Sequence, residues 1–139
     1  MPVRFIRDRR GASAVEFAIV TPVFLAMLFG IVTYGYVLAL GHGLQQLAGE
    51  AARASVSGIT DAERGTIARA FVADNLGAYG VIDGARLQVA AGGSTVPAST
   101  FEVVLTYDLR DLFFTRLGAW VPSPGTEMRR AAIIQRGGY

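Results

Sequence analysis

The sequence contains no cysteine, no lysine and only one histidine, His42. Without cysteine the chain cannot form a disulfide, a thiolate metal site, a thiol nucleophile or a lipid-modified cysteine. No acidic residue stands beside His42, so no nucleophile–histidine–acid set can be assembled. Phosphate-binding loops and dinucleotide-binding fingerprints are also missing. The sequence therefore predicts no enzyme activity and no cofactor.

The charged residues also predict neither a metal site nor a nucleic-acid-binding surface. Asp108 and Asp111 are close in sequence but lack further ligands at a suitable spacing, so we predict no metal site. Residues 41–139 contain nine arginines and nine acidic residues, which sum to zero. The positive charge lies in residues 1–11, where one acid, Asp8, opposes Arg4, Arg7, Arg9 and Arg10. With no excess charge to neutralise phosphates, the C-terminal part is not expected to bind nucleic acid.

One long apolar run dominates the N-terminal part. No charged residue occurs from Phe17 to Leu40. As a helix this run is about 36 Å long, enough to cross a hydrocarbon core of about 30 Å, whereas buried core helices rarely have such long apolar runs. Because the arginines precede it, we expect the N-terminus in the cytoplasm and the remainder of the chain outside.

A cleaved secretory signal is the main alternative for this run. Val37 and Ala39 would supply the small residues of a cleavage site before Leu40. However, the run is far longer than the core of a usual signal peptide, and Glu16 precedes it. A membrane anchor is the better interpretation.

The junction RRGASAVEF, before the apolar run, carries the most specific pattern. A carboxylate such as Glu16 at the start of a membrane helix is costly unless it has a partner. Cleavage after Gly11 would expose the α-amine of Ala12 and place Glu16 at the fifth position of the mature chain. That amine and carboxylate could then pair, within a chain or between neighbouring subunits.

This arrangement resembles the prepilins, and most closely the TadE-like minor pseudopilins of tight-adherence (Flp-type) pilus systems. The features shared with that family are the Gly-x-x-x-Val-Glu-Phe start at Gly11–Phe17, the proline Pro22, and the Ala-Ala-Arg stretch Ala51–Arg53. The resemblance covers about the first 57 residues. It implies that Gly11 is recognised by a prepilin peptidase, that Ala12 becomes the N-terminus, and that Glu16 acts in processing or subunit insertion.

The same resemblance implies partners and a location. We expect a bacterial inner-membrane protein with one span that meets the prepilin peptidase, other minor pseudopilins, the major Flp pilin and the pilus assembly platform, besides the lipid bilayer. A single-span exported binding protein without leader cleavage remains the second hypothesis.

Small residues recur every four positions along the apolar run, at Ala18, Pro22, Ala26 and Gly30. Such spacing lets a second helix approach closely in lipid, although alanine and glycine are common in this sequence. Pro22 removes a backbone hydrogen bond and is expected to kink the helix. Gly41 and Gly43 predict a looser helix where it leaves the bilayer.

We divide the chain into a basic leader (residues 1–11), a transmembrane and continuing helix (12–57) and an exported domain (58–139). In that domain, Thr60 to Glu63 has capping-box spacing and predicts a helix that ends near Gly77. Alternating apolar residues predict strands over 87–91, 101–109 and about 127–136. The expected fold class is α+β, a pilin-like domain of one helix and about three antiparallel strands.

An apolar cluster precedes the last predicted strand. Its members are Leu112, Phe113, Phe114, Leu117 and Trp120. It either caps the core or forms a contact surface for another pilus subunit.

Overall fold

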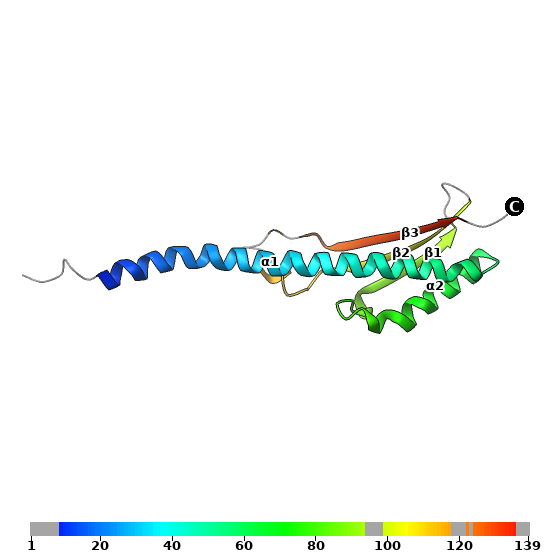
Figure 1. Cartoon of the computed structure of the whole chain (residues 1–139), viewed down its shortest axis with the longest axis horizontal. Coiled ribbons are helices and arrows are strands. Elements are labelled where there is room, and N and C mark those ends of the chain that lie inside the picture. The colour runs from blue at the N-terminus through cyan, green and yellow to red at the C-terminus, as the bar shows by residue number, and fades with distance from the viewer. Residues whose placement is uncertain (1–8, 94–98, 118–121, 123, 136–139) are drawn as a thin grey trace, which may run out of the picture.

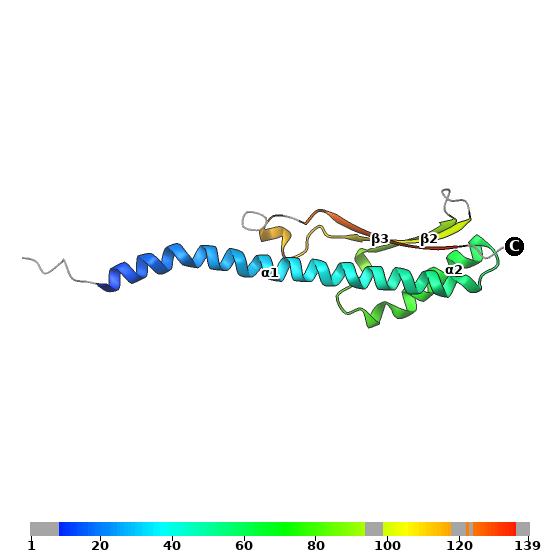
Figure 2. The same ribbon diagram turned by 45° about the horizontal axis from the view of Figure 1, so that its top comes forward.

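The computed structural model describes residues 9–93, 99–117, 122 and 124–135. One long helix, α1 (Arg9–Ala54), runs along most of the molecule. The remaining elements gather beside its C-terminal half, while its N-terminal half extends away from them in both views (Figures 1 and 2). The fold is α+β, as predicted, with a candidate transmembrane helix.

Helix α1 is continuous through the proline and the glycines that were expected to disturb it. Pro22 lies inside the helix, next to Thr21, whose hydroxyl donates to the Phe17 carbonyl at 2.6 Å. Gly41 is buried where a Cβ atom would come within 3.0 Å of the Arg130 guanidinium. Gly43 similarly lies against Ile82. The expectation of a loosened helix is therefore wrong, because these glycines make room for neighbouring elements.

The second helix, α2 (Asp61–Asn75), begins at the predicted cap. The Thr60 hydroxyl accepts from the Glu63 backbone N–H at 3.2 Å, and the Glu63 carboxylate accepts from the Ile59 N–H at 2.9 Å. The first bond satisfies an N–H group that the first helical turn leaves unpaired, and the second ties the residue before the cap to the helix. The helix gives way at Leu76–Ala78 to a 3₁₀ turn, so the predicted end near Gly77 is confirmed within two residues.

Three antiparallel strands form one sheet in the order β1 (Leu87–Gly93), β2 (Thr100–Asp108), β3 (Glu127–Gln135). In the central strand, Tyr107 pairs with Leu87 on one side and Met128 on the other. Alternate β2 side chains point toward the helices and are at most 1% exposed: Phe101, Val103, Leu105 and Tyr107. The predicted alternation along β2 is thus confirmed.

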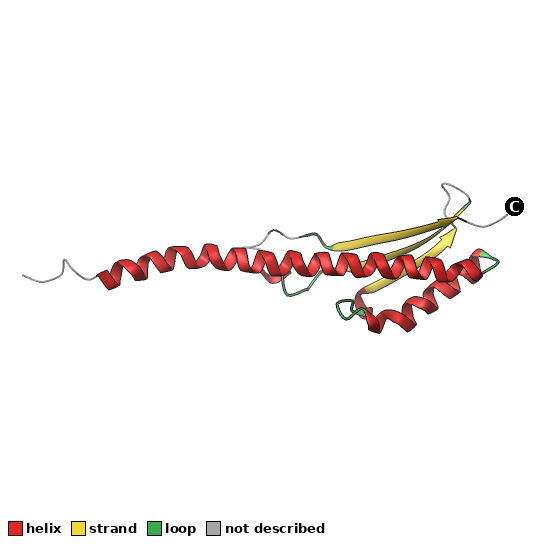
Figure 3. Cartoon of the chain, in the orientation of Figure 1, coloured by secondary structure: helices red, strands yellow, loops and turns green. Residues whose placement is uncertain are grey.

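The two helices cover one face of the sheet (Figure 3). Helix α1 packs on β2 and β3, and α2 packs on β1. The second half of α1 contributes much of the hydrophobic core, through Leu40, Leu44, Leu47, Ala48, Ala51 and Ala52, all 0% exposed. The folded domain is therefore built around the helix, and does not follow it as a separate unit.

Gly58 occupies the turn between the two helices, where the buried Arg64 packs against it. The Arg64 Nε donates to the Gly58 carbonyl at 2.8 Å. A Cβ atom at Gly58 would lie 2.8 Å from the Arg64 backbone nitrogen. Gly58→Ala is therefore expected to lower the free energy of unfolding by about 1–3 kcal/mol through overpacking.

Thermal unfolding of the full chain in detergent micelles measures this effect. Gly77→Ala is the matched control, because nothing lies within 4 Å of a Cβ atom at Gly77. Equal melting temperatures for the two variants would show that the Gly58 turn tolerates a side chain.

Candidate functional site: an exposed apolar helix and the base of the domain

The residues of the predicted processing junction lie in the first turns of α1. Gly11, Ala12 and Glu16 are all exposed, and open space surrounds Gly11. Residues four apart on a helix share a face, so Ala12 and Glu16 lie one turn apart on the same side. The structure thus places the junction where another protein can reach it; cleavage itself stays a prediction.

The apolar part of α1 is uncovered by the rest of the chain. None of residues 11–32 is buried, and Phe17, Met27 and Ile31 are each more than 60% exposed. Among the described residues, α1 is the one helix long and apolar enough to cross a membrane, with a mean hydropathy of 2.3 over its best 18-residue window. Such a surface in water would be strongly unfavourable, which indicates a membrane anchor.

The small residues proposed for helix packing lie on this uncovered stretch. Ala18 and Pro22 are exposed, and Ala26 and Gly30 are partly exposed. No described element of the chain packs on Gly30, where a Cβ atom would meet open space. A packing role for these positions requires a second helix from another subunit and stays a prediction.

The first buried residue of α1 is Thr33, well before the apolar run ends. Thr33 is 1% exposed, and the Tyr34 and Tyr36 hydroxyls donate to the backbone carbonyls of Pro122 at 3.4 Å and Val81 at 3.3 Å. The last eight residues of the apolar run are therefore shared between anchor and domain.

Part of the predicted apolar cluster packs on this stretch of α1. We call the end of the domain where Tyr36, Phe113 and Phe114 meet its base. Asp111 has a φ of 60°, a left-handed conformation that aspartate tolerates, and it turns the chain after β2. Phe114 then enters the core at 2% exposure, while Phe113 stays 49% exposed. Tyr36 packs on both rings, with centroid distances of 5.9 Å to Phe113 and 6.1 Å to Phe114.

The core-capping interpretation of this cluster therefore holds for Phe114. The Leu117 side chain and Trp120 lie outside the described residues.

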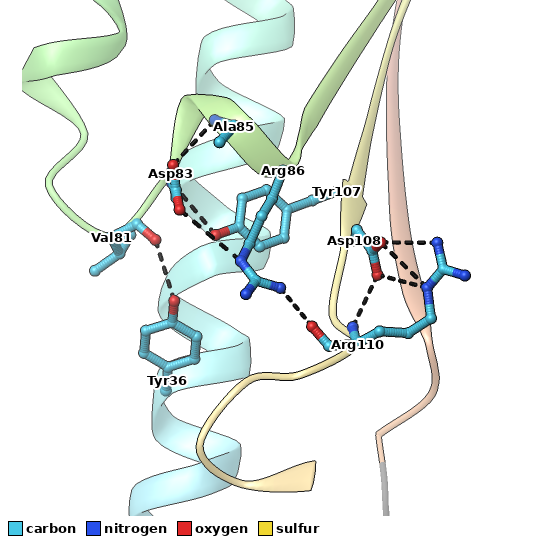
Figure 4. A network of polar contacts seen from close by, with 8 residues as sticks. All are labelled: Tyr36, Val81, Asp83, Ala85, Arg86, Tyr107, Asp108 and Arg110. Carbon is cyan, nitrogen blue, oxygen red and sulfur yellow. Dashed lines mark hydrogen bonds and ion pairs between the residues drawn. The ribbon is translucent and has the colours of Figure 1, made fainter.

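A polar network beside this cluster ties the loop before β1 to the end of β2 (Figure 4). The Asp83 backbone N–H donates to the Tyr107 hydroxyl at 3.3 Å, and the Asp83 carboxylate lies 3.8 Å from the Arg86 guanidinium. Arg86 in turn donates to the Arg110 carbonyl. Since Tyr36 bonds to Val81 in the same loop, the network fixes the base of the domain to α1.

Asp108 and Arg110 form a two-pronged ion pair at the edge of this network. The shortest contact, between Arg110 Nη2 and Asp108 Oδ2, is 2.8 Å. Hydrogen bonds from the Arg110 side chain and backbone lower the pKa of Asp108 to about 2. Both carboxylate oxygens of Asp108 thus accept from Arg110. Among the described residues, no group of three or more potential ligands gathers.

Arg110→Ala is expected to reduce the acid sensitivity of the fold. Asp108 titrates at about 3.9 in an unfolded chain and at about 2 in the folded one, so its stabilising contribution is present above about pH 4 and is lost as the pH falls to about 2. The melting temperature of the full chain should therefore fall less between pH 5 and pH 2 in Arg110→Ala than in the wild type. The exposed Arg69→Ala variant should keep the wild-type slope, and an unchanged slope in Arg110→Ala would contradict the assignment.

An α+β domain built on a long helix, with an uncovered apolar half, defines the chain as a candidate membrane-anchored protein with one span. Residues 11–53 match the family model described as TadE-like protein. The match begins at the predicted cleavage glycine and ends at Arg53 of the Ala-Ala-Arg stretch, which confirms the resemblance to this family. No curated protein and no solved structure matches the chain.

Proposed function

We propose that this chain is a minor pseudopilin that acts in the assembly of a Flp-type pilus. The observation that carries the proposal is the TadE-like match over residues 11–53, which spans the junction, the apolar run and the Ala-Ala-Arg stretch. In this role α1 anchors the chain in the inner membrane, with the basic leader in the cytoplasm and the α+β domain outside. The proposed partners are the major Flp pilin, other minor pseudopilins and the assembly platform.

A prepilin peptidase is proposed to cleave the chain between Gly11 and Ala12. The exposure of both residues at the start of α1 supports this step. Both residues lie in the first turn of α1, close to its N-terminal end. After cleavage, the Ala12 amine would meet the Glu16 carboxylate of its own or a neighbouring chain, which relieves the cost of placing either charge near lipid.

The uncovered stretch of α1 provides a surface for lateral contacts. Residues 17–32 present apolar side chains in every direction, so lipid or the helices of other subunits can surround them. The positions Ala18, Pro22, Ala26 and Gly30 would allow close approach of another helix in the assembling pilus.

Release by signal peptidase before Leu40 is disfavoured by the packing of the domain. Cleavage there would remove the buried Thr33 and the Tyr36 ring that packs on Phe113 and Phe114. It would also cut α1 at Leu40, which is 0% exposed in the core. An anchored exported protein without leader cleavage remains the second candidate, since it keeps all of these contacts.

Filament yield in a deletion strain tests the assembly role. Removing the gene is expected to abolish or strongly reduce Flp-type filaments, and the wild-type chain should restore them. Immunoblots of sheared filaments should detect far less of this chain than of the major pilin. Normal piliation of the deletion strain would contradict the proposal and favour the anchored binding protein.

A further inference from the structure

The stretch of α1 that contains no buried residue is shorter than a bilayer is thick, because one side of the helix is covered from Thr33 onward. From Phe17 to Val32, the residue before the buried Thr33, the helix is about 24 Å long. The hydrocarbon core is about 30 Å thick. The deficit is about 6 Å, or four residues. With Glu16 at the cytoplasmic boundary, a full span reaches Tyr36, which is already packed against the domain.

The domain presents apolar side chains at the level of Tyr36. Phe113 is 49% exposed although its ring lies 5.9 Å from that of Tyr36, and Val81, whose carbonyl accepts from Tyr36, is 37% exposed. Tyr34, in the same turn of α1, is 43% exposed. We call these four residues, Tyr34, Tyr36, Val81 and Phe113, the aromatic collar.

We propose that the aromatic collar inserts into the outer interface of the bilayer, so that the base of the domain, and not α1 alone, completes the span. The collar is continuous with the apolar surface of α1 below it, which favours lipid as the occupant. Tyrosine rings suit this depth, because the ring can enter the acyl region while the hydroxyl stays near the headgroups. The wholly apolar Phe113 ring can enter the acyl region beside them. The hydroxyls of Tyr34 and Tyr36 are already bonded to backbone carbonyls, so they can reach this depth without losing a partner.

An inserted collar would set the height of the domain above the membrane. The collar lies at the end of the domain where Tyr36 meets Phe113, whereas Ile59, which is 87% exposed, follows the C-terminal end of α1. Insertion of the collar would hold the sheet and α2 at a fixed distance from the lipid. The proposal rests on the membrane anchor of the preceding section and does not depend on the pilus role.

Site-directed spin labelling tests the depth of the collar, because the chain has no native cysteine. A nitroxide is attached to the cysteine of each of three single variants of the full chain: Phe113→Cys, Met27→Cys and Ile59→Cys. The labelled proteins are placed in vesicles of phosphatidylethanolamine and phosphatidylglycerol. Collision rates with oxygen and with a water-soluble nickel chelate report depth. The ratio of oxygen to nickel accessibility at position 113 should be several-fold higher than at position 59 and approach that at position 27.

The three positions separate failure of the collar from failure of the anchor. A position 113 as accessible to nickel as position 59, with position 27 protected, would overturn the collar alone. A position 27 accessible to nickel would overturn the anchor as well. Protection of position 113 that disappears when the protein is diluted into excess lipid would identify a second copy of the chain as the occupant and overturn the lipid assignment. Val81→Cys repeats the test at a second collar position should the Phe113 variant unfold.

Discussion

Leu44→Ala is expected to lower the free energy of unfolding of the domain by about 2–5 kcal/mol, the cost of opening a cavity in a packed core. Leu44 lies on α1, four residues beyond the apolar run, and is 0% exposed. Small domains have a net stability of only about 5–15 kcal/mol, so this single change removes a large fraction of it. The size of the effect follows from the packing of the sheet directly on α1.

The matched control is Leu38→Ala on the same helix, because Leu38 is 62% exposed and contributes little to the core. Its effect should stay within about 0.5 kcal/mol. Hydrogen exchange of the β2 amides in micelles measures both variants on the full chain. Equal protection of β2 in the two variants would mean that α1 and the domain fold independently, contrary to the structure.

Glu16→Ala is expected to abolish filament assembly or reduce it strongly. In the proposed mature protein, this change leaves the Ala12 ammonium without its partner at the edge of the bilayer. In the proposed filament, neighbouring helices would bury this pair, and breaking a buried ion pair costs about 3–5 kcal/mol, which corresponds to a loss of more than about 100-fold in an assembly equilibrium. Filament yield measured by shearing and immunoblotting of the major pilin reports the loss.

Glu127→Ala is the control for removal of one negative charge, since Glu127 lies on β3 and is exposed. This variant should assemble at the wild-type level. Wild-type filament yield from Glu16→Ala would show that the carboxylate has no role in assembly. Uncleaved Glu16→Ala protein in the membrane would instead place its role at processing.

The elements of the domain could be predicted because their patterns are local. Thr60 and Glu63 define the start of α2, and the alternation from Phe101 to Tyr107 defines β2 and its buried face. The last strand was expected over about 127–136 and spans Glu127–Gln135. In each case a short segment combines apolar and polar residues with one clear period.

The base of the domain could not be predicted because the apolar run has no polar face. From Thr33 onward α1 buries a stripe with helical spacing that continues through Leu40, Leu44 and Leu47. Inside the run every face is apolar, so the buried stripe cannot be told from the exposed positions until the exposed Gln45 and Gln46 appear. The deep packing of Gly41 and the contacts of Tyr36 depend on distant segments, which no local pattern encodes.

A single chain does not test the predicted packing positions or the processing junction. The exposure of Ala18 and Glu16 in a single chain is compatible with contacts to other subunits, which one chain does not contain. The roles proposed for them rest on the resemblance and, for Glu16, on the cost of a charge near lipid. They are decided by processing and assembly experiments.

Mass spectrometry of the purified membrane protein identifies the mature N-terminus and so tests whether the chain is a processed pseudopilin. We expect a chain that begins at Ala12 in cells that contain the prepilin peptidase, and an uncut leader in cells that lack it. A chain that keeps its leader in both strains, or one that begins at Leu40, would contradict the assignment as a processed pseudopilin.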